Sequence, residues 1–463
     1  MYSVVHWLQH DTAGLLTLSA AAIAALLTMI MRFRVEPFIA LIITGLLLAL
    51  AAGLPVRDIV GSAQKSSESL LENGFGSILG HITAIVGLGA ILGAVLENSG
   101  GAQLLTRRLL AAFGQRRAPL AMGLAGLVFG VPVFFDIGIF VLAPLVYVAA
   151  RQGGRSILLY CLPLVAGLSM THAFLPPHPG PVVAAGLLGV DMGWLIIMGL
   201  ACGLPAFVVA GVLYSSWIGN RIHLPVPETA GEPPEDAGEP PLGVVALVIG
   251  LPVLLILGGT FAGITLPPGA ALDALTFLGN PVVALTIAVL IAFWLLGTRR
   301  GLGGADIAEL TARALRPLGM ILLVVGAGGF FGEVLSETGV GDALAGSLQA
   351  TGLPVIASAY LISSGMRIAQ GSATVAIVTT GGIVAPLLAG SAYSQPQLAL
   401  VAVAIGAGSI IASHVNDGGF WIISRYFGIP VAEMLKTWTV LETILSLSAF
   451  AVAAGLSVLV CAR

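Results

Sequence analysis

Two long apolar segments of this chain are each interrupted by residues that break helices, and each interruption carries a histidine. The first reads SMTHAFLPPHPGP around His172, and the second reads ASHVNDGGF around His414. A helix break inside a bilayer frees backbone amides and carbonyls that lipid cannot satisfy, so it persists only where protein or a water-filled cavity receives these groups. Paired breaks in corresponding positions of two halves are typical of the binding site of a secondary transporter.

The composition is that of a membrane protein. Hydrophobic residues make up 57% of the 463 residues and charged residues 9%, whereas a soluble domain carries about 25% charged residues. This balance excludes a soluble globular protein. Together with the apolar runs and their interruptions, it predicts an all-α polytopic membrane protein with about 10 transmembrane helices, two re-entrant hairpins and two broken helices. The net charge is -3 and the basic residues are scattered in short pairs, so no nucleic-acid partner is expected.

The positions of the arginines orient the predicted helices. Apolar runs of roughly 20 residues can span a bilayer, and arginine and lysine accumulate in cytoplasmic loops. The first run, about 12 to 31, ends at Arg32 and Arg34, which places the N-terminus outside the cell; the same rule places the C-terminus outside. The segment MYSVVHWLQHD has no basic region, so we expect a retained first helix rather than a cleaved signal peptide.

The apolar block from about 119 to 149 carries arginines on both sides. Arg116 and Arg117 precede it, and Arg151 and Arg155 follow it, so a single crossing would put one pair on the wrong side of the membrane. The block is also too short for two full spans of about 20 residues each. A re-entrant hairpin with its tip near PVFFDIG fits both the charge and the length.

Two halves of the chain resemble each other weakly. GAILGAVLENSGG from Gly89 aligns without a gap with GGFFGEVLSETGV from Gly328, and after a shift of three residues His172 falls on His414. In the predicted topology five crossings separate the two copies, and an odd number of crossings inverts the second copy relative to the first. The sequence therefore predicts an inverted repeat.

A proline-rich acidic segment, PVPETAGEPPEDAGEPP, separates the halves, and we interpret it as a solvated cytoplasmic linker. Residues 1–77 are predicted to form N-terminal scaffold helices with an external segment. The first inverted repeat, 78–224, contains a hairpin at 119–149 and a broken helix at 157–189. After the linker at 225–241, the second repeat, 242–463, contains a hairpin at 354–390 and a broken helix at 398–424. Such an arrangement brings the hairpin tips and the helix breaks together near the bilayer midplane.

The residues most indicative of function are polar side chains at membrane depth. An ionisable side chain there costs at least about 2.5 kcal/mol unless it faces the protein interior or water. The candidates for substrate binding are Asp136, His172, His178, Ser372, Thr374, His414, Asn416 and Asp417. Four of these, Asp136, His172, His414 and Asp417, are also candidates to carry a coupling proton, because histidine has an ordinary pKa of about 6.5 and burial raises that of aspartate. Arg367 is either a structural ion-pair partner or a substrate ligand.

Each candidate also has an ordinary structural explanation. His172 and His414 fit core histidines bonded to nearby carbonyls, and Asp136 fits a helix cap. The hydroxyls of Ser372 and Thr374 fit hydrogen bonds to the preceding helical turn. The sequence leaves these alternatives open.

An enzyme and a channel are both disfavoured. The six-residue spacing of His172 and His178, with four prolines nearby, does not put both rings on one helix face as a zinc-binding HExxH motif does, so neither a metal site nor a metalloprotease is expected. Polar re-entrant tips also build channel filters, but a filter usually arises from subunits around one axis, whereas these tips are paired by inversion.

Four strings resemble the gluconate:proton symporter (gluconate permease) family, which is grouped in the wider ion transporter superfamily. They are FGVPVFFDIGIFVLAPLV, THAFLPPHPGPVVAAGLLGVDMGWLIIMGL, RIAQGSATVAIVTTGGIVAPLL and SHVNDGGFWIISRYFGIPVAEMLKTWTVLETI. The resemblance runs from the second helix to the C-terminus, and the PPHPGP and HVNDGGFW blocks are its most specific parts.

The resemblance implies a proton-driven importer of gluconate or a related small hydroxy-carboxylate in a bacterial inner membrane. It also implies a homodimer whose transport domain moves against a scaffold as an elevator. In the predicted mechanism, backbone amides at the tips bind the substrate carboxylate, and Ser372, Thr374 and Asn416 contact its hydroxyls. The coupling ion is expected to be a proton, with no bound cofactor; sodium coupling, or another small carboxylate or D-amino acid as substrate, stays open.

Overall fold

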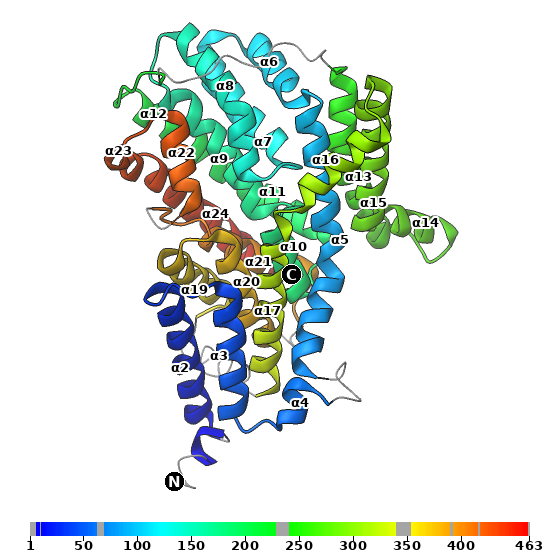
Figure 1. Ribbon diagram of the computed structural model, residues 1–463, viewed down its shortest axis with the longest axis vertical. Helices are drawn as coiled ribbons and strands as arrows, with labels where there is room; N and C mark the ends of the chain where they lie inside the picture. Colours follow the sequence, from blue (N-terminus) through cyan, green and yellow to red (C-terminus); the bar gives the residue numbers. More distant parts are fainter. Residues whose placement is uncertain are drawn as a thin grey trace.

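The computed structural model describes residues 6–9, 11–62, 69–227, 240–338, 353–388, 392–414 and 417–461. These residues form helices joined by turns and loops, and none of them lies in a β-strand (Figure 1). Within these ranges, nine helical stretches are long and apolar enough to cross a bilayer. The prediction of an all-α polytopic membrane protein is confirmed. Asn416, most of the linker and part of the external segment lie outside the described residues.

Helices α2 (Thr12–Met31) and α3 (Pro37–Ala51) form one end of the molecule together with parts of two long helices, α5 (Leu70–Asn98) and α17 (Leu318–Glu337) (Figure 1). Helix α17 packs against both α3 and α5. Side chains from α2, α3, α5 and α17, with Ile59 of α4 (Val56–Val60) and Val375 and Ile383 of α20 (Ala373–Leu388), make an apolar cluster separate from the main core. This end of the molecule therefore has its own core.

Helix α5 begins earlier than the sequence pattern predicts. The apolar run predicts a start near residue 78, but the helix starts at Leu70. The hydroxyl of Ser69 accepts a hydrogen bond from the backbone N–H of Glu72 at 3.2 Å, which caps the helix. An N-cap serine satisfies one of the free amides of the first turn, so a polar start of this kind extends the helix beyond its apolar part.

Two helix pairs occupy the positions of the predicted hairpins. In the first, α7 (Ala118–Gly130) is followed after four residues by α8 (Phe135–Gly153). In the second, α19 (Val355–Gln370) is followed after two residues by α20 (Ala373–Leu388). The second turn contains Gly371 at φ +87°, a conformation that glycine adopts without a steric penalty.

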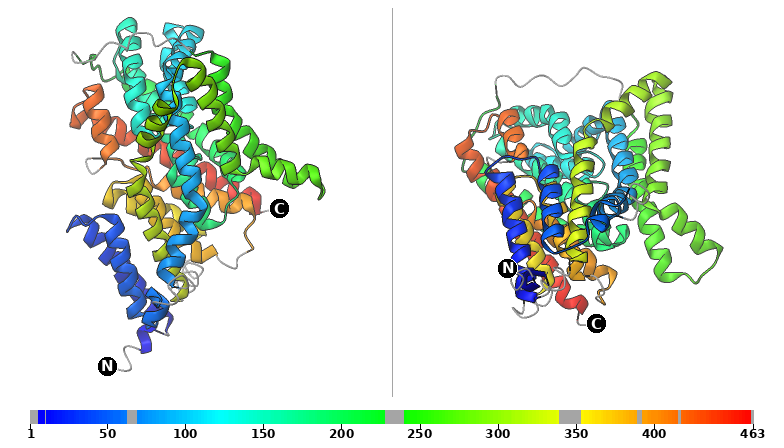
Figure 2. Two further views of the ribbon diagram at one scale, coloured as in Figure 1. Left: turned by 45° about the vertical axis from the view of Figure 1, so that its right-hand side comes forward. Right: turned by 60° about the horizontal axis from the view of Figure 1, so that its bottom comes forward.

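The two predicted helix breaks are also present. Helix α9 (Leu158–Phe174) ends just before Pro176 and Pro177, and α10 (Pro179–Leu188) starts after them. Helix α21 (Gln395–Gly408) and α22 (Gly418–Phe427) are separated by the segment that carries His414. Figure 2 shows α21 and α22 from two further sides. Proline has no backbone N–H and cannot continue a helix, which explains the first break.

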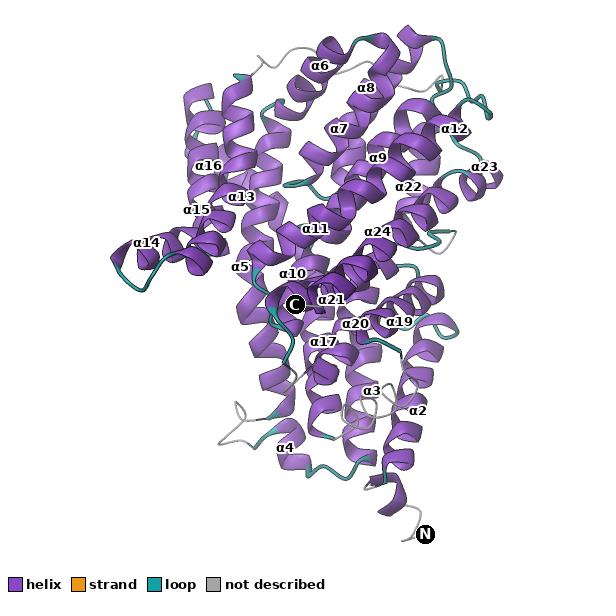
Figure 3. Ribbon diagram, turned by 180° about the vertical axis from the view of Figure 1, so that it is seen from behind, coloured by secondary structure: helices purple, strands orange, loops and turns teal. Residues whose placement is uncertain are grey.

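The remaining helices surround these pairs (Figure 3). Helix α14 projects from the side of the molecule beside α13 and α15 (Figures 1 and 3). The bounds are α4 Val56–Val60, α6 Gly101–Phe113, η1 Gln115–Arg117, α11 Met192–Phe207, η2 Val208–Tyr214, α12 Ser215–Gly219, α13 Leu242–Thr265, α14 Ala270–Gly279, α15 Pro281–Ala292, η3 Phe293–Gly297, η4 Thr298–Arg300, α16 Gly304–Leu315, α23 Val431–Lys436 and α24 Trp438–Cys461.

Helix α9 lies at the centre of the main core and crosses α7 closely. Every residue of α9 is buried except His172, which is partly exposed. A Cβ added to Gly126 of α7 would lie 2.2 Å from the carbonyl oxygen of Leu164, and one added to Gly167 of α9 would lie 2.6 Å from the carbonyl oxygen of Gly123. Glycines at this crossing therefore allow the two backbones to touch.

Gly126→Val is expected to lower the melting temperature of the purified protein, because the added side chain meets backbone that cannot move aside. Overpacking of this kind costs about 1–3 kcal/mol or more. The matched control is Gly250→Val in α13, where an added Cβ meets nothing within 4 Å. Equal melting temperatures for the two variants would show that the α7–α9 crossing is not tight.

Candidate functional site

A cavity of about 540 Å³ lies where the second hairpin, the start of α8 and both helix breaks meet. Elements from both halves of the chain line it, including α5, α9, α17 and α24. Its polar lining side chains are Asp136, Ser169, His172, Arg313, Arg367, Ser372, Thr374, Asp417, Trp438 and Glu442. The chain thus gathers at one place many of the few polar residues that its apolar helices contain.

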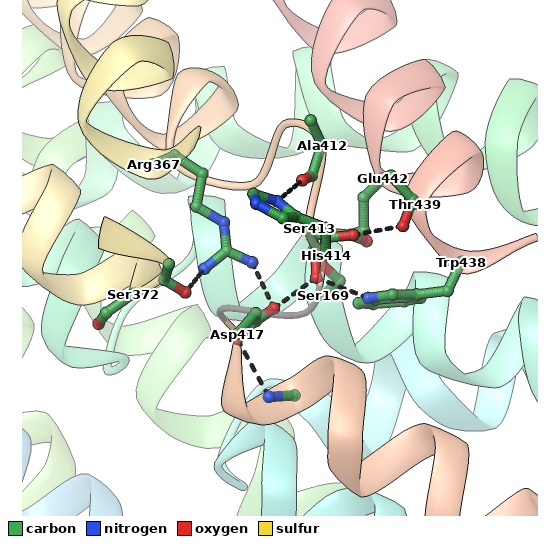
Figure 4. Close-up of polar contacts among 12 residues, drawn as sticks. Ser169, Arg367, Ser372, Ala412, Ser413, His414, Asp417, Trp438, Thr439 and Glu442 are labelled. Carbon is green, nitrogen blue, oxygen red and sulfur yellow. Dashed lines mark hydrogen bonds and ion pairs between the residues drawn. The ribbon is translucent and has the colours of Figure 1, made fainter. Parts of the chain in front are cut away.

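Arg367 and Asp417 form a buried ion pair between the second hairpin and the second helix break (Figure 4). Arg367 is 4% exposed, and its guanidinium Nη2 donates to Oδ2 of Asp417 while Nη1 donates to the carbonyl oxygen of Gly371. Oδ1 of Asp417 accepts a hydrogen bond from the N–H of Gly419 at 3.0 Å and so caps α22. The pair joins α19 to α22.

One further hydrogen bond lies within the second break, and two more hold the break against α24 (Figure 4). The Ser413 hydroxyl donates to Asp417, and Trp438 Nε1 donates to the Ser413 hydroxyl at 2.7 Å. Thr439 donates to the Ser413 carbonyl oxygen. Asp417 is therefore fixed in position by several partners rather than free in the cavity.

The three predicted histidines have different surroundings. His172 lines the cavity, and its Nδ1 is buried without a hydrogen-bond partner. His178 is 2% exposed, and its Nε2 donates to the carbonyl oxygen of Gly130 in the first hairpin. His414 donates from Nδ1 to the carbonyl oxygen of Ala412 at 2.8 Å. His178 and His414 are absent from the cavity lining, and each makes the carbonyl bond of a core histidine, whereas His172 faces the cavity.

Asp136 occupies the first turn of α8 and is exposed within the cavity. The N-cap of α8 is Phe134, and no side chain caps the helix there. The position puts a carboxylate at the positive end of the helix, which favours its charge. Asp136 therefore faces the cavity from a helix start without acting as the N-cap.

Ser372 and Thr374 also line the cavity, at the start of α20. The Ser372 hydroxyl accepts a hydrogen bond from the N–H of Val375 at 3.4 Å. Of the predicted binding residues, Asp136, His172, Ser372, Thr374 and Asp417 thus lie around one cavity, and Asn416 lies outside the described residues.

The sequence interpretation missed Glu442 and Ser169. Glu442 is 1% exposed, lines the cavity from α24 and accepts a hydrogen bond from the Ser169 hydroxyl at 2.9 Å. The available signal was an acidic residue within the apolar segment WTVLETILSLSAFAVAAG. Glu442 lies in the apolar helix that follows the second break, and the break residues alone do not indicate it.

A second cavity, of about 390 Å³, lies among α5, α10, α17 and α20. Its lining includes Ser77, Gly329 and Glu333. In the ungapped alignment of the two halves, Gly329 and Glu333 correspond to Ala90 and Ala94, which line the first cavity. Residues of α5 that line the first cavity are therefore aligned in sequence with residues of α17 that line the second cavity.

Among the described residues, no group of three or more His, Cys, Asp or Glu side chains is placed to hold a metal ion.

Known proteins resemble this chain over nearly its whole length. The inner membrane permease YgbN of Escherichia coli is 41% identical over 95% of this chain and 98% of its own, and the gluconate permease of Pseudomonas aeruginosa is 40% identical over 95% of this chain and 96% of its own. The crystal structure of the Alcanivorax borkumensis YdaH transporter superposes with a TM-score of 0.62 over 90% of this chain and 98% of that chain; at 17% identity, this likeness concerns the fold. The sequence pattern of the GntP family permeases matches residues 14–460 of this chain. The chain therefore belongs to the GntP permease family and is a multi-pass membrane transport protein, not an enzyme.

Proposed function

We propose that this protein is a secondary transporter that imports gluconate, or a related small hydroxy-carboxylate, together with protons. The observation that carries the proposal is the polar cavity, which joins Arg367, Asp136 and the hydroxyls of Ser372 and Thr374 inside an otherwise apolar protein. Charged groups at membrane depth are costly and mark substrate or ion pathways. We name gluconate because the Pseudomonas aeruginosa relative is a gluconate permease. The Escherichia coli relative YgbN is described only as an inner membrane permease, so the proposal also includes related acids.

The substrate carboxylate binds near the backbone amides at the starts of α8 and α20, where the helix dipoles favour an anion. The substrate hydroxyls bond to Asp136, Ser372, Thr374 and Asn416. Two buried atoms of the lining residues support a polar ligand: Nε of Arg367 and Nδ1 of His172 have no hydrogen-bond partner. Buried polar groups are normally bonded, so water or substrate is required there.

The transport cycle alternates access to the site from the two membrane faces. The two cavities support this part of the proposal, because aligned positions of α5 and α17 line them. The proposal further comprises an inverted repeat, an elevator movement against a scaffold that includes α2 and α3, a homodimer, and an inner membrane location with both termini outside. A protonatable side chain near the cavity couples transport to the proton gradient, with Asp136, His172, His414 and Asp417 as the candidates from the sequence.

The test is uptake of labelled gluconate into liposomes that contain the purified protein. Accumulation is expected with an inward proton gradient, collapse with a protonophore, and acceleration when unlabelled gluconate is preloaded. Preloading separates a carrier from a pore, because exchange accelerates only a carrier. Accumulation that follows a sodium gradient instead would transfer the coupling to sodium, and flux that preloading does not accelerate would refute the carrier.

A further inference from the structure

Glu442 is a carboxyl group with only one of its two oxygens bonded. Its helix, α24, packs against α9, α11 and α21. Its Oε2 accepts the hydrogen bond from Ser169 of α9 at 2.9 Å, and its Oε1 is buried without a hydrogen-bond partner. Figure 4 shows Glu442 and Ser169 together with Trp438 and Thr439, which also belong to α24. The residue is 1% exposed and still contributes to the cavity wall.

Among the residues that the structure describes, Glu442 forms no ion pair. Two cations line the cavity: Arg367 already pairs with Asp417, and Arg313 has a largely exposed side chain that pairs with Glu309. Of the elements packed against α24, α21 has no titratable side chain, α11 has only Cys202, and α9 presents His172 to the cavity. The titratable side chains of the other elements are Tyr360 and Arg367 in α19, Tyr214 in η2, and Glu433 and Lys436 in α23; Tyr360 bonds to Ser446, and Glu433 and Lys436 pair with each other. A buried carboxylate with one hydrogen bond and no counter-ion is strongly disfavoured, so this environment favours the protonated acid.

We infer that Glu442 binds the coupling proton, an inference that rests on the proposed function. The carboxylate takes a proton from water when the cavity faces the proton-rich side, crosses as the neutral acid with the bound anion, and returns the proton to water on the other side. Only an O–H bond forms and breaks. Substrate and proton are coupled because a neutral Glu442 does not repel an anion in the shared cavity. Asp136 faces the same cavity from the first turn of α8 and bonds to substrate hydroxyls.

The test compares the parent with Glu442→Gln, which keeps the shape of the side chain but cannot exchange a proton. In liposomes, Glu442→Gln is expected to exchange external labelled gluconate for internal gluconate, with a rate independent of pH. Accumulation driven by a proton gradient is expected to fall at least tenfold. The matched control is Glu72→Gln, the same substitution at an exposed residue in the first turn of α5 that lines neither cavity, which is expected to accumulate gluconate as the parent does.

Different outcomes overturn different statements. If Glu442→Gln still accumulates gluconate as the parent does, Glu442 does not bind the coupling proton, and the proposed function stands. Loss of accumulation with retained exchange in Asp136→Asn, but not in Glu442→Gln, assigns the proton to Asp136. If the parent itself exchanges gluconate without responding to a proton gradient, proton coupling fails and the inference fails with it.

A second variant keeps the inference testable if Glu442→Gln does not fold. Ser169→Ala removes the donor to Oε2 and leaves the carboxyl in place. Because that donor stabilises the ionised form, the pH of half-maximal exchange is expected to move upward while accumulation is retained. An unchanged pH profile in a folded Ser169→Ala protein would count against Glu442.

Discussion

Neutralising either member of the Arg367–Asp417 pair is expected to abolish gluconate uptake and to destabilise the protein. The two charges are buried together, and removal of one leaves the other uncompensated, which costs about 3–5 kcal/mol. Arg367→Gln also weakens the bond to the Gly371 carbonyl, and Asp417→Asn weakens the cap of α22 and the bond from Ser413. Each single variant is expected to lose at least 100-fold in uptake, measured in liposomes, and to melt at a lower temperature in detergent.

The double variant Arg367→Gln/Asp417→Asn separates stability from function. With both charges removed, no buried charge is unpaired, so the melting temperature is expected to recover while uptake stays low. Lys436→Gln is the matched control, because it breaks an exposed pair with Glu433 at 3.0 Å in which the lysine side chain is 62% exposed. Such surface pairs contribute about 0–1 kcal/mol. If Arg367→Gln and Asp417→Asn both kept the uptake rate and the melting temperature of the parent, a role for the buried pair would be contradicted.

The helical class and the positions of both breaks were predictable from local chemistry. Apolar composition determines the class, and Pro176 and Pro177 end α9 because proline lacks the N–H that a helix needs. At the second break, α22 starts after Asp417, a preferred N-cap residue, and Gly418. The early start of α5 was missed, since a search for apolar runs passes over the polar turn that Ser69 caps.

The contacts within the site were much less predictable, because they join residues far apart in the sequence. Asp417 was identified by its depth, but its ion pair is with a residue 50 positions earlier. Ser169 and Glu442 are 273 positions apart. Neither pairing follows from helical periodicity, which predicts neighbours only within one helix. The carbonyl bonds of His178 and His414 likewise depend on tertiary placement.

Alternating access is expected to appear as opposite changes at two positions of one helix. Ser77 lines the second cavity and Ala94 the first, and at 1.5 Å per residue they lie about 25 Å apart along α5. In a variant without the three native cysteines, Ser77→Cys and Ala94→Cys report on the two cavities separately. Gluconate with a proton gradient is expected to change their rates of labelling by a charged thiol reagent at least threefold, in opposite directions.

The sign of the two changes decides between a carrier and a pore. Both cavities are bounded by α5 and α17, so in the proposed cycle the movement that opens one cavity closes the other. A continuous pore would instead raise both rates together on opening. Ala270→Cys, at the exposed start of α14 and away from both cavities, is the control, and its rate is expected to stay constant. Parallel changes at Ser77 and Ala94 would therefore contradict alternating access even if gluconate flux were observed.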